Sequence, residues 1–201
     1  MLKKDISRLR SLCAQYADIA AMPFNNTLRR QWHKLNALHP ERPMFIIDEL
    51  PWHELNAEGE LTLHCEDSTC RLIEQDLLRL LYRYHYLKDD FVFDPYLYVP
   101  KKILGADFDP ATGVALDYGI SIMQNTIETH PDNPVLAHQY TDQLKSEEDL
   151  SKLKASEIVL DTATTQKREE IAHEAADGIL KVRMDGFTPW FAAWDYIVEW
   201  R

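Results

Sequence analysis

The sequence predicts an α/β fold with parallel strands, arranged as a partial (half) TIM-type barrel behind two N-terminal helices. Three short apolar runs are each followed by an acidic turn, and amphipathic helical segments separate them. Such alternation is typical of βα units, which form parallel sheets. A closed eight-stranded barrel needs about 250 residues. The chain has 201 residues, so we expect about half of such a barrel.

Two helices are predicted before the first strand. The first covers approximately residues 6–20, where apolar residues recur at helical spacing. The second begins with Asn26 or Thr27 as its N-cap and ends before Pro40. We therefore expect an N-terminal helical segment over residues 1–41 and the partial barrel over residues 42–201.

The first strand is predicted at residues 44–47, an apolar run that suits burial on both faces of a parallel sheet. Residues 60–65 alternate between polar and apolar types, which fits a short strand or an extended loop. Asp67 or Ser68 then caps the clearest helix of the chain, whose apolar face extends to Tyr84.

The second strand is predicted at residues 90–95, followed by a loop and a short helix that ends at Gly105. Residues 106–119 have no clear pattern and are interpreted as a loop or a hairpin. A helix start is expected at residues 146–149, where acidic residues suit the helix dipole.

The third strand is predicted at residues 179–184. The helix before it opens at Asp161 and is closed by Gly178. A final aromatic helix is predicted at residues 189–200.

Composition excludes several classes of partner. The net charge of −11 argues against nucleic acid and anionic membrane surfaces as partners. No stretch approaches the roughly 20 apolar residues that span a bilayer, and no signal peptide is recognised. Three cysteines, an odd count, fit reduced thiols better than disulfides. We expect a soluble cytoplasmic protein.

Acidic residues after the predicted strands are the candidate functional groups. Parallel sheets and barrels place ligand sites beyond the carboxyl ends of their strands. Carboxylates and histidine at such positions can serve as general acids and bases or can help to bind a metal. The alternative interpretation is that these residues form a solvent-exposed turn without a functional role. The predicted catalytic residues are Asp48, Glu49, His53 and Asp94, with Glu54 beside them. The predicted substrate-binding residues are Trp52, Tyr96, Asp185 and Trp190.

Two further hypotheses concern charge and metal binding. If the strand ends share one edge, Asp48, Asp94 and Asp185 converge, and their repulsion raises at least one pKa. Cys65 and Cys70 are of a ligand type that zinc prefers. Their spacing is wider than in most zinc knuckles and no second pair exists, so buried structural cysteines are favoured. No glycine-rich phosphate loop is present.

The chain resembles the N-terminal half of the uroporphyrinogen decarboxylase superfamily, which includes the decarboxylases and related cobalamin-dependent methyltransferases. The resemblance is carried by the leading helices, by Arg42-Pro43 and by the block DFVFDPYLYVPKKILG at residues 90–105, which is similar to the family's second-strand segment. The turn DGFTPW at residues 185–190 is similar to the family's Gly-x-Pro-Trp/Phe-Thr turn.

One departure separates the chain from the decarboxylases. Their first strand is followed by the turn Arg-Gln-Ala-Gly-Arg, whose arginines hold the carboxylates of the porphyrinogen. Here the turn is ELPWH at residues 49–53, without arginine. Each close pair of carboxylates would repel by about 1 kcal/mol even at a water-like dielectric constant. The resemblance therefore implies the methyltransferase branch, with a corrinoid and zinc as implied cofactors. In that branch the zinc ligands come from the C-terminal half of the barrel. The sequence ends at Arg201, before that half, so we expect a truncated member or a half-barrel.

The expected function is that of the N-terminal part of a corrinoid-dependent methyltransferase-type barrel that forms substrate-pocket walls. Its expected partners are a small-molecule substrate or a corrinoid protein. One alternative is a noncatalytic half-barrel interaction module, whose open edges favour a homo-oligomer or docking of a missing C-terminal half. Another is uroporphyrinogen decarboxylase (lyase) activity in tetrapyrrole biosynthesis, with Arg183 or Lys101 and Lys102 supplying positive charge.

Overall fold

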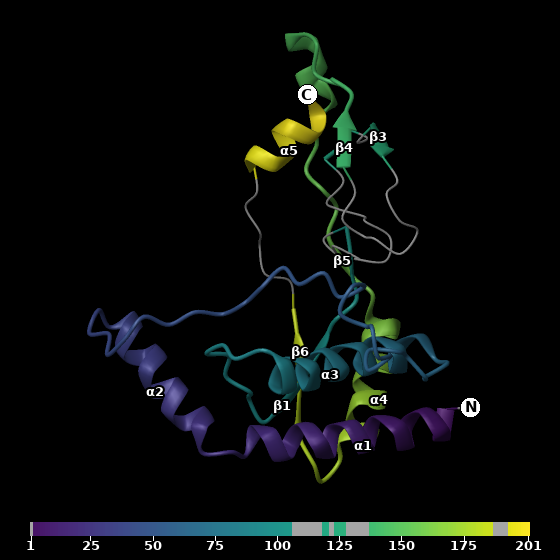
Figure 1. Ribbon diagram of the computed structural model, residues 1–201. Coiled ribbons are helices and arrows are strands. Elements are labelled where there is room, and N and C mark those ends of the chain that lie inside the picture. The colour runs from purple at the N-terminus through teal and green to yellow at the C-terminus, as the bar shows by residue number, and fades with distance from the viewer. Residues whose placement is uncertain (1, 106–117, 121–122, 128–136, 187–192) are drawn as a thin grey trace. The chain divides into compact units, whose positions relative to one another are not determined.

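The computed structural model describes residues 2–105, 118–120, 123–127, 137–186 and 193–201 (Figure 1). The fold is mixed α/β. Contacts divide the chain into unit 1, Met1–Val99 with Gln166–Met184, and unit 2, Pro100–Thr165 with Asp185–Arg201. The N-terminal helices belong to unit 1 together with residues 42–99. The expected domain boundary near residue 41 stays a prediction.

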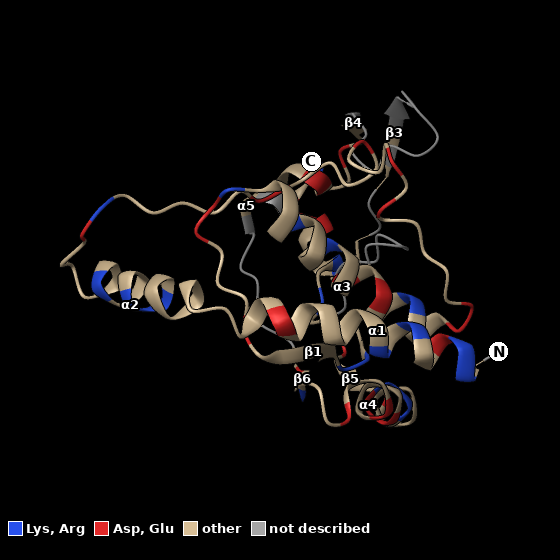
Figure 2. Ribbon diagram, turned by 60° about the horizontal axis from the view of Figure 1, so that its bottom comes forward, with Lys and Arg blue, Asp and Glu red and all other residues tan. Residues whose placement is uncertain are grey.

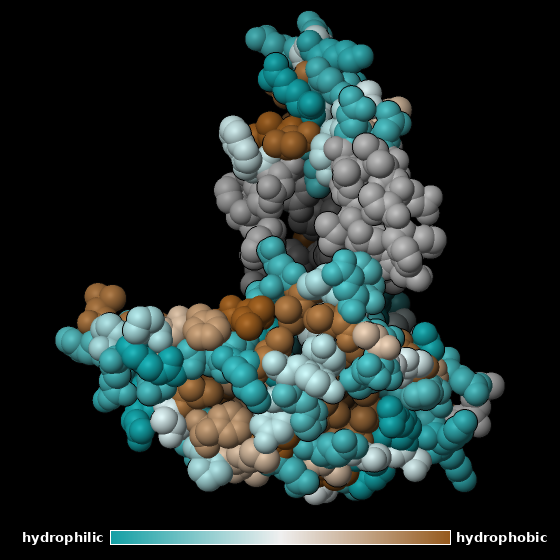
Figure 3. All heavy atoms as spheres, viewed as in Figure 1, coloured by the Kyte–Doolittle hydropathy of each residue, from teal (hydrophilic) through white to brown (hydrophobic). Residues whose placement is uncertain are grey.

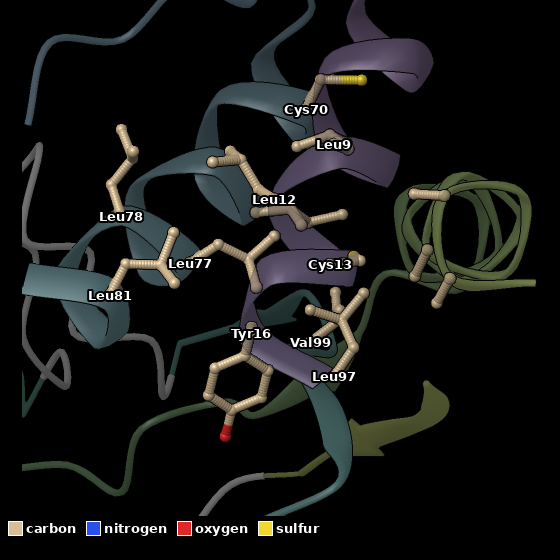
Figure 4. Packing of buried hydrophobic residues seen from close by; sticks show 14 of the residues in the cluster. Leu9, Leu12, Cys13, Tyr16, Cys70, Leu77, Leu78, Leu81, Leu97 and Val99 are labelled. Atoms are coloured by element: carbon tan, nitrogen blue, oxygen red, sulfur yellow. The ribbon is translucent and has the colours of Figure 1, made fainter. Parts of the chain in front are cut away.

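Helices α1 (Leu2–Ala20) and α3 (Ser68–Tyr86) form the core of unit 1 and lie side by side (Figures 1 and 2). Their predicted apolar faces are the buried faces. Leu9 and Leu77 are completely buried, and Figure 4 shows them in the contact between the two helices. The predicted cap of α3 is confirmed, since Asp67 accepts hydrogen bonds from the backbone N–H groups of Thr69 and Cys70 at 2.8 and 3.2 Å.

Helix α2 (Phe24–Asn36) begins directly after Pro23, earlier than the predicted N-cap. The reason is Asn25, which is buried inside the first turn instead of lying before it. Its side-chain amide donates to the carbonyl oxygen of Ile19 at 2.9 Å, and its Oδ1 accepts from the N–H of Phe93 at 2.9 Å. Asn25 thus joins the end of α1 to a distant part of the chain.

One parallel strand pair is present among the described residues: β1 (Tyr96–Pro100) with β6 (Lys181–Asp185). The third predicted strand is therefore confirmed, displaced by about two residues. The loop expected at the start of residues 96–105 is wrong, because residues 96–100 form β1 with Leu97 and Val99 buried. Two paired strands do not establish the expected half barrel.

The strands predicted at residues 44–47 and 90–95 are wrong, since both segments lack regular structure. Carboxylates take the place of a neighbouring strand: the N–H of Phe45 donates to Asp90 at 3.0 Å, and that of Ile47 donates to Asp89 at 3.1 Å. Phe45, Ile46 and Ile47 are 54%, 47% and 38% exposed rather than buried on two faces. The segment after α2 shows this apolar surface (Figure 3).

Helix α4 (Thr162–Ala176) follows the predicted helix closely. Its buried residues include the small side chains Ala172 and Ala175, which allow close packing. Gly178 follows the helix with a φ of +73°, the left-handed conformation expected of a C′ residue. Arg10 of α1 donates to the backbone carbonyl oxygens of Glu174 and Asp177, each at 3.0 Å, and so satisfies acceptors at the helix end.

Unit 2 contains two short antiparallel pairs. They are β2 (Ile103–Leu104) with β5 (Val159–Leu160) and β3 (Gln124–Ile127) with β4 (Ala137–Tyr140). The short helix expected before Gly105 is wrong, because β2 occupies that position. The helix start expected at residues 146–149 is confirmed as a 3₁₀ helix, Glu147–Lys152, with a capping box between Ser146 and Asp149. The last helix, α5, covers Ala193–Trp200.

Two expectations fall partly outside the described residues. The hairpin or loop predicted over residues 106–119 includes residues 106–117, which are not described, and the first residues of the predicted C-terminal helix also lie outside. None of the helices that the structure describes is both long enough and apolar enough to cross a bilayer.

Candidate functional site

A cavity of about 330 Å³ lies within unit 1. It is lined by residues of α1, α3 and β1 and by Trp52 and Phe91 from the segments that precede α3 and β1. Its walls are mainly apolar and strongly aromatic. The aromatic lining residues are Tyr16, Trp52, Phe91, Tyr96 and Tyr98. An apolar cavity with a few polar groups is the usual form of a small-molecule site, and this volume is at the lower end of the usual range.

Two charged residues of α3, Asp76 and Arg79, line this cavity; Figure 2 shows that α3 carries both signs of charge along its length. The guanidinium carbon of Arg79 lies 5.2 Å from the centre of the Trp52 ring. Within the described part of the chain, neither Asp76 nor Arg79 makes a hydrogen bond or an ion pair. Both therefore have unused capacity for a polar ligand.

Burial acts on the protonation of both residues. It raises the pKa of the Asp76 carboxyl, and the nearby positive charge of Arg79 offsets only part of this rise. Burial also lowers the pKa of Arg79, which the charge of Asp76 partly offsets. An acid with a raised pKa inside an apolar cavity is the environment that tunes carboxyl groups for proton transfer or for donating a hydrogen bond.

Arg83 also lines the cavity but has a structural role. It is buried, forms an ion pair with Asp89, and donates to the carbonyl oxygen of Ile47 at 2.7 Å. Its guanidinium carbon also lies 4.7 Å from the centre of the Phe91 ring. The hydrogen bond holds residues 44–47 beside α3, and the ion pair with Asp89 neutralises the charge of Arg83.

Tyr16 supplies a fixed polar group at the cavity wall. Its hydroxyl donates to the backbone carbonyl oxygen of Asp94 at 2.9 Å. Burial, together with the nearby charge of Asp94, raises the pKa of Tyr16 to about 12. The phenol therefore stays protonated and serves as a neutral donor.

Two of the predicted substrate-binding residues, Trp52 and Tyr96, lie in this cavity. They come from separate segments, the turn after residues 44–47 and the start of β1. The Tyr96 ring is 5.9 Å from that of Tyr98, and the Trp52 ring is 6.0 Å from that of Tyr82. Both residues therefore line one cavity, and their role in substrate binding stays a prediction.

The predicted catalytic residues of the first turn lie in a series of tight turns. Asp48 and Glu49 are exposed, and Glu49 has a φ of +53°. His53 is mostly buried, with its Nε2 3.6 Å from a carboxylate oxygen of Glu54. The His53 Nδ1 atom is buried and has no hydrogen-bond partner. Of the four acidic and imidazole groups expected here, only His53 and Glu54 are in contact.

Asp94 and Asp185 have contacts of their own. The Asp94 carboxylate accepts two hydrogen bonds from Arg29, at 2.7 and 3.2 Å. Asp185 is exposed and belongs to unit 2, where its carbonyl oxygen accepts from the N–H of Lys101 at 2.9 Å. The convergence of Asp48, Asp94 and Asp185 stays a prediction. Trp190 lies outside the described residues.

Sequence reasoning missed Asp76 and Arg79. Their spacing of three residues on a helix is typical of a solvated surface pair. One signal was present, since Asp76 follows Ile73 by three residues and precedes Leu80 by four, which places it beside the apolar stripe of α3.

Cys65 and Cys70, the cysteines considered as zinc ligands, are both buried. Burial, reinforced by Glu74, raises the pKa of Cys65 to about 12, and burial raises that of Cys70 to about 11. Both residues belong to the buried core, as favoured from the sequence. Among the described residues, no group of three or more His, Cys, Asp or Glu side chains is arranged to hold a metal ion.

An ion pair between the exposed Arg42 and the buried Asp90 predicts an acid-sensitive contribution to stability. Asp90 accepts from Arg42 at 2.9 Å, and this bond lowers the pKa of Asp90 despite burial. A lowered folded-state pKa gives stability that is present above the unfolded value of about 3.9 and is lost as pH falls through the folded value. Asp90→Asn should therefore be less stable than the wild type at neutral pH, and the difference should narrow on acidification.

Urea unfolding between about pH 7 and about pH 3 measures this difference. Asp18→Asn, at an exposed position of α1, is the matched control. Its free energy of unfolding should differ little from that of the wild type at every pH in this range. A difference for Asp90→Asn that stays constant with pH would contradict the ion-pair explanation.

Comparisons with protein-family models, with curated proteins and with solved structures gave no match.

Proposed function

We propose that the chain is a small-molecule-binding α/β protein, in which the residues around the unit 1 cavity form the walls of a substrate pocket. The observation that carries this proposal is the cavity of about 330 Å³ in which Asp76 and Arg79 stand among aromatic side chains without hydrogen-bond partners. Asp76 and Arg79 are partly buried and attract each other electrostatically. Their side-chain donors and acceptors have no hydrogen-bond partner among the described residues, so a polar ligand in the cavity could bond to them.

The resemblance to the uroporphyrinogen decarboxylase superfamily extends this proposal. In its methyltransferase branch, the cavity would hold the small substrate rather than the cofactor. A corrin ring and a porphyrinogen are both far larger than a cavity at the lower end of the small-molecule range. The cavity size therefore favours methyl transfer on a small substrate over decarboxylation of a porphyrinogen inside this cavity.

A noncatalytic interaction module is a second candidate. The observation in its favour is the exposure of three consecutive apolar residues, Phe45, Ile46 and Ile47, which are 54%, 47% and 38% exposed. Exposed contiguous apolar residues mark docking surfaces. The solution mass, measured together with the binding of a fluorescent dye to apolar surface, separates these cases. A dimer that binds little dye favours the module, and a dye-binding monomer argues against self-association.

Ligand-detected NMR with a set of small aromatic and methylated compounds tests the cavity proposal. Leu80 lines the cavity, so Leu80→Trp should fill it and abolish binding of any true cavity ligand. Compounds that bind the wild type and lose binding in Leu80→Trp support the proposal. Binding that persists in this variant, or no binding by any compound, would contradict it.

A further inference from the structure

We propose that the cavity selects a small aromatic carboxylate, a single ring whose acid group pairs with Arg79 and whose face lies against the aromatic wall. This inference rests on the proposed function and adds the chemical class of the ligand. Three features of unit 1 support it: the unpaired donors of Arg79, the aromatic wall of the cavity and the carboxyl group of Asp76 in its lining.

The arginines favour an anionic ligand. Arg79 has no hydrogen-bond or ion-pair partner among the described residues, so its planar group of five donors is available for a carboxylate. Arg83, in contrast, is already neutralised by Asp89. Of the two arginines that line the cavity, Arg79 is therefore the one whose guanidinium N–H groups are all available to a ligand.

A cationic ligand is disfavoured by the same groups. Aromatic cavities bind quaternary ammonium ions through the faces of their rings. Here Arg79, Arg83 and Arg183 have their guanidinium carbons 5.2, 4.7 and 5.9 Å from the ring centres of Trp52, Phe91 and Tyr98 respectively. A bound cation would compete with these groups for the rings and would be repelled by their charges.

The walls favour a flat and small ligand. Five aromatic residues from separate segments line the cavity, and aromatic pairs gain energy from edge-to-face and offset contacts with a ring. The volume of about 330 Å³ suits one ring with its acid group and leaves no space for a fused macrocycle.

Asp76 couples anion binding to a proton. Burial already raises the pKa of this carboxyl, and a ligand carboxylate nearby would raise it further by like-charge repulsion. In the complex the protonated Asp76 donates to the ligand, and binding takes up one proton. Affinity should therefore increase as pH falls towards the pKa of free Asp76 and level off below it.

Isothermal titration calorimetry with benzoate, benzamide and benzyltrimethylammonium provides the test. Benzoate should bind most tightly, and its affinity should increase as pH falls from about 8 to about 5. Arg79→Met should lower the affinity for benzoate by about tenfold or more and should change the affinity for benzamide little. Asp76→Asn provides a permanent donor, so benzoate should bind it with no pH dependence. Arg30→Met, at an exposed position of α2, is the control and should bind as the wild type does.

The outcomes separate this inference from the proposed function. If benzamide or the ammonium compound binds more tightly than benzoate, and Leu80→Trp abolishes that binding, the ligand class is wrong while the cavity site stands. If Arg79→Met, shown to be folded by circular dichroism, binds benzoate as the wild type does, the inference is also wrong. If no probe binds, both proposals fail.

Discussion

Replacing Arg83 with methionine is expected to destabilise the protein by about 3–5 kcal/mol. Arg83 and its partner Asp89 have side chains only 9% and 2% exposed. Removing the arginine leaves the Asp89 carboxylate buried without a compensating charge, and the carbonyl oxygen of Ile47 loses its donor. Chemical unfolding followed by circular dichroism measures the loss.

Two further variants identify its cause. Asp89→Asn in the Arg83→Met background removes the uncompensated charge, so it should recover part of the lost stability. Arg30→Met deletes an exposed arginine of α2 and should change stability by less than about 0.5 kcal/mol. If the double variant is no more stable than Arg83→Met alone, the loss comes from packing against Phe91 rather than from the buried charge.

The helices of unit 1 are predictable because their signals are local. In α1 and α3 the apolar residues recur on one face, and the same face is buried against the neighbouring helix. Asp67 is an N-cap that acts on the N–H groups two and three residues later, so it needs no distant partner. Gly178 likewise ends α4 through its own backbone conformation.

The strands were predicted less well because a strand depends on its neighbours. The apolar run at residues 44–47 has the composition of a buried strand, but side-chain carboxylates of Asp89 and Asp90 accept its N–H groups. The block at residues 90–95 is similarly tied to Asn25. Strand β1 carried a period-two signal in Leu97 and Val99, which the flanking prolines and lysines concealed.

The candidate site follows the same division. Trp52 and Tyr96 were expected beyond the ends of predicted strands, and both line the cavity. Asp76 and Arg79 were missed because their environment is created by distant residues: Tyr16 of α1, Trp52 and the tyrosines of β1 complete the cavity around them. Burial by tertiary packing is therefore what turns an ordinary helical charge pair into a candidate site.

Replacing Glu74 with glutamine is expected to cost about 3 kcal/mol, because Glu74 is a completely buried carboxylate that organises its surroundings. It accepts from the N–H groups of His64 and Cys65 at 2.9 and 2.8 Å, and from Arg8 at 3.1 Å. Burial alone would raise the pKa of Glu74, but these hydrogen bonds outweigh it and leave the pKa lowered. Glutamine has the same shape as glutamate, but its side-chain NH₂ group would face Arg8 or the N–H groups of His64 and Cys65, which are themselves donors.

The matched control is Glu169→Gln, an identical change at an exposed position of α4, which should alter stability by less than about 0.5 kcal/mol. The lowered pKa adds a pH signature: the contribution of Glu74 is complete above its unfolded pKa of about 4.3 and is lost as pH falls through the folded value. The stability difference between wild type and Glu74→Gln should therefore shrink in acid. A difference under about 1 kcal/mol at neutral pH would mean that Glu74 does not organise residues 64–65.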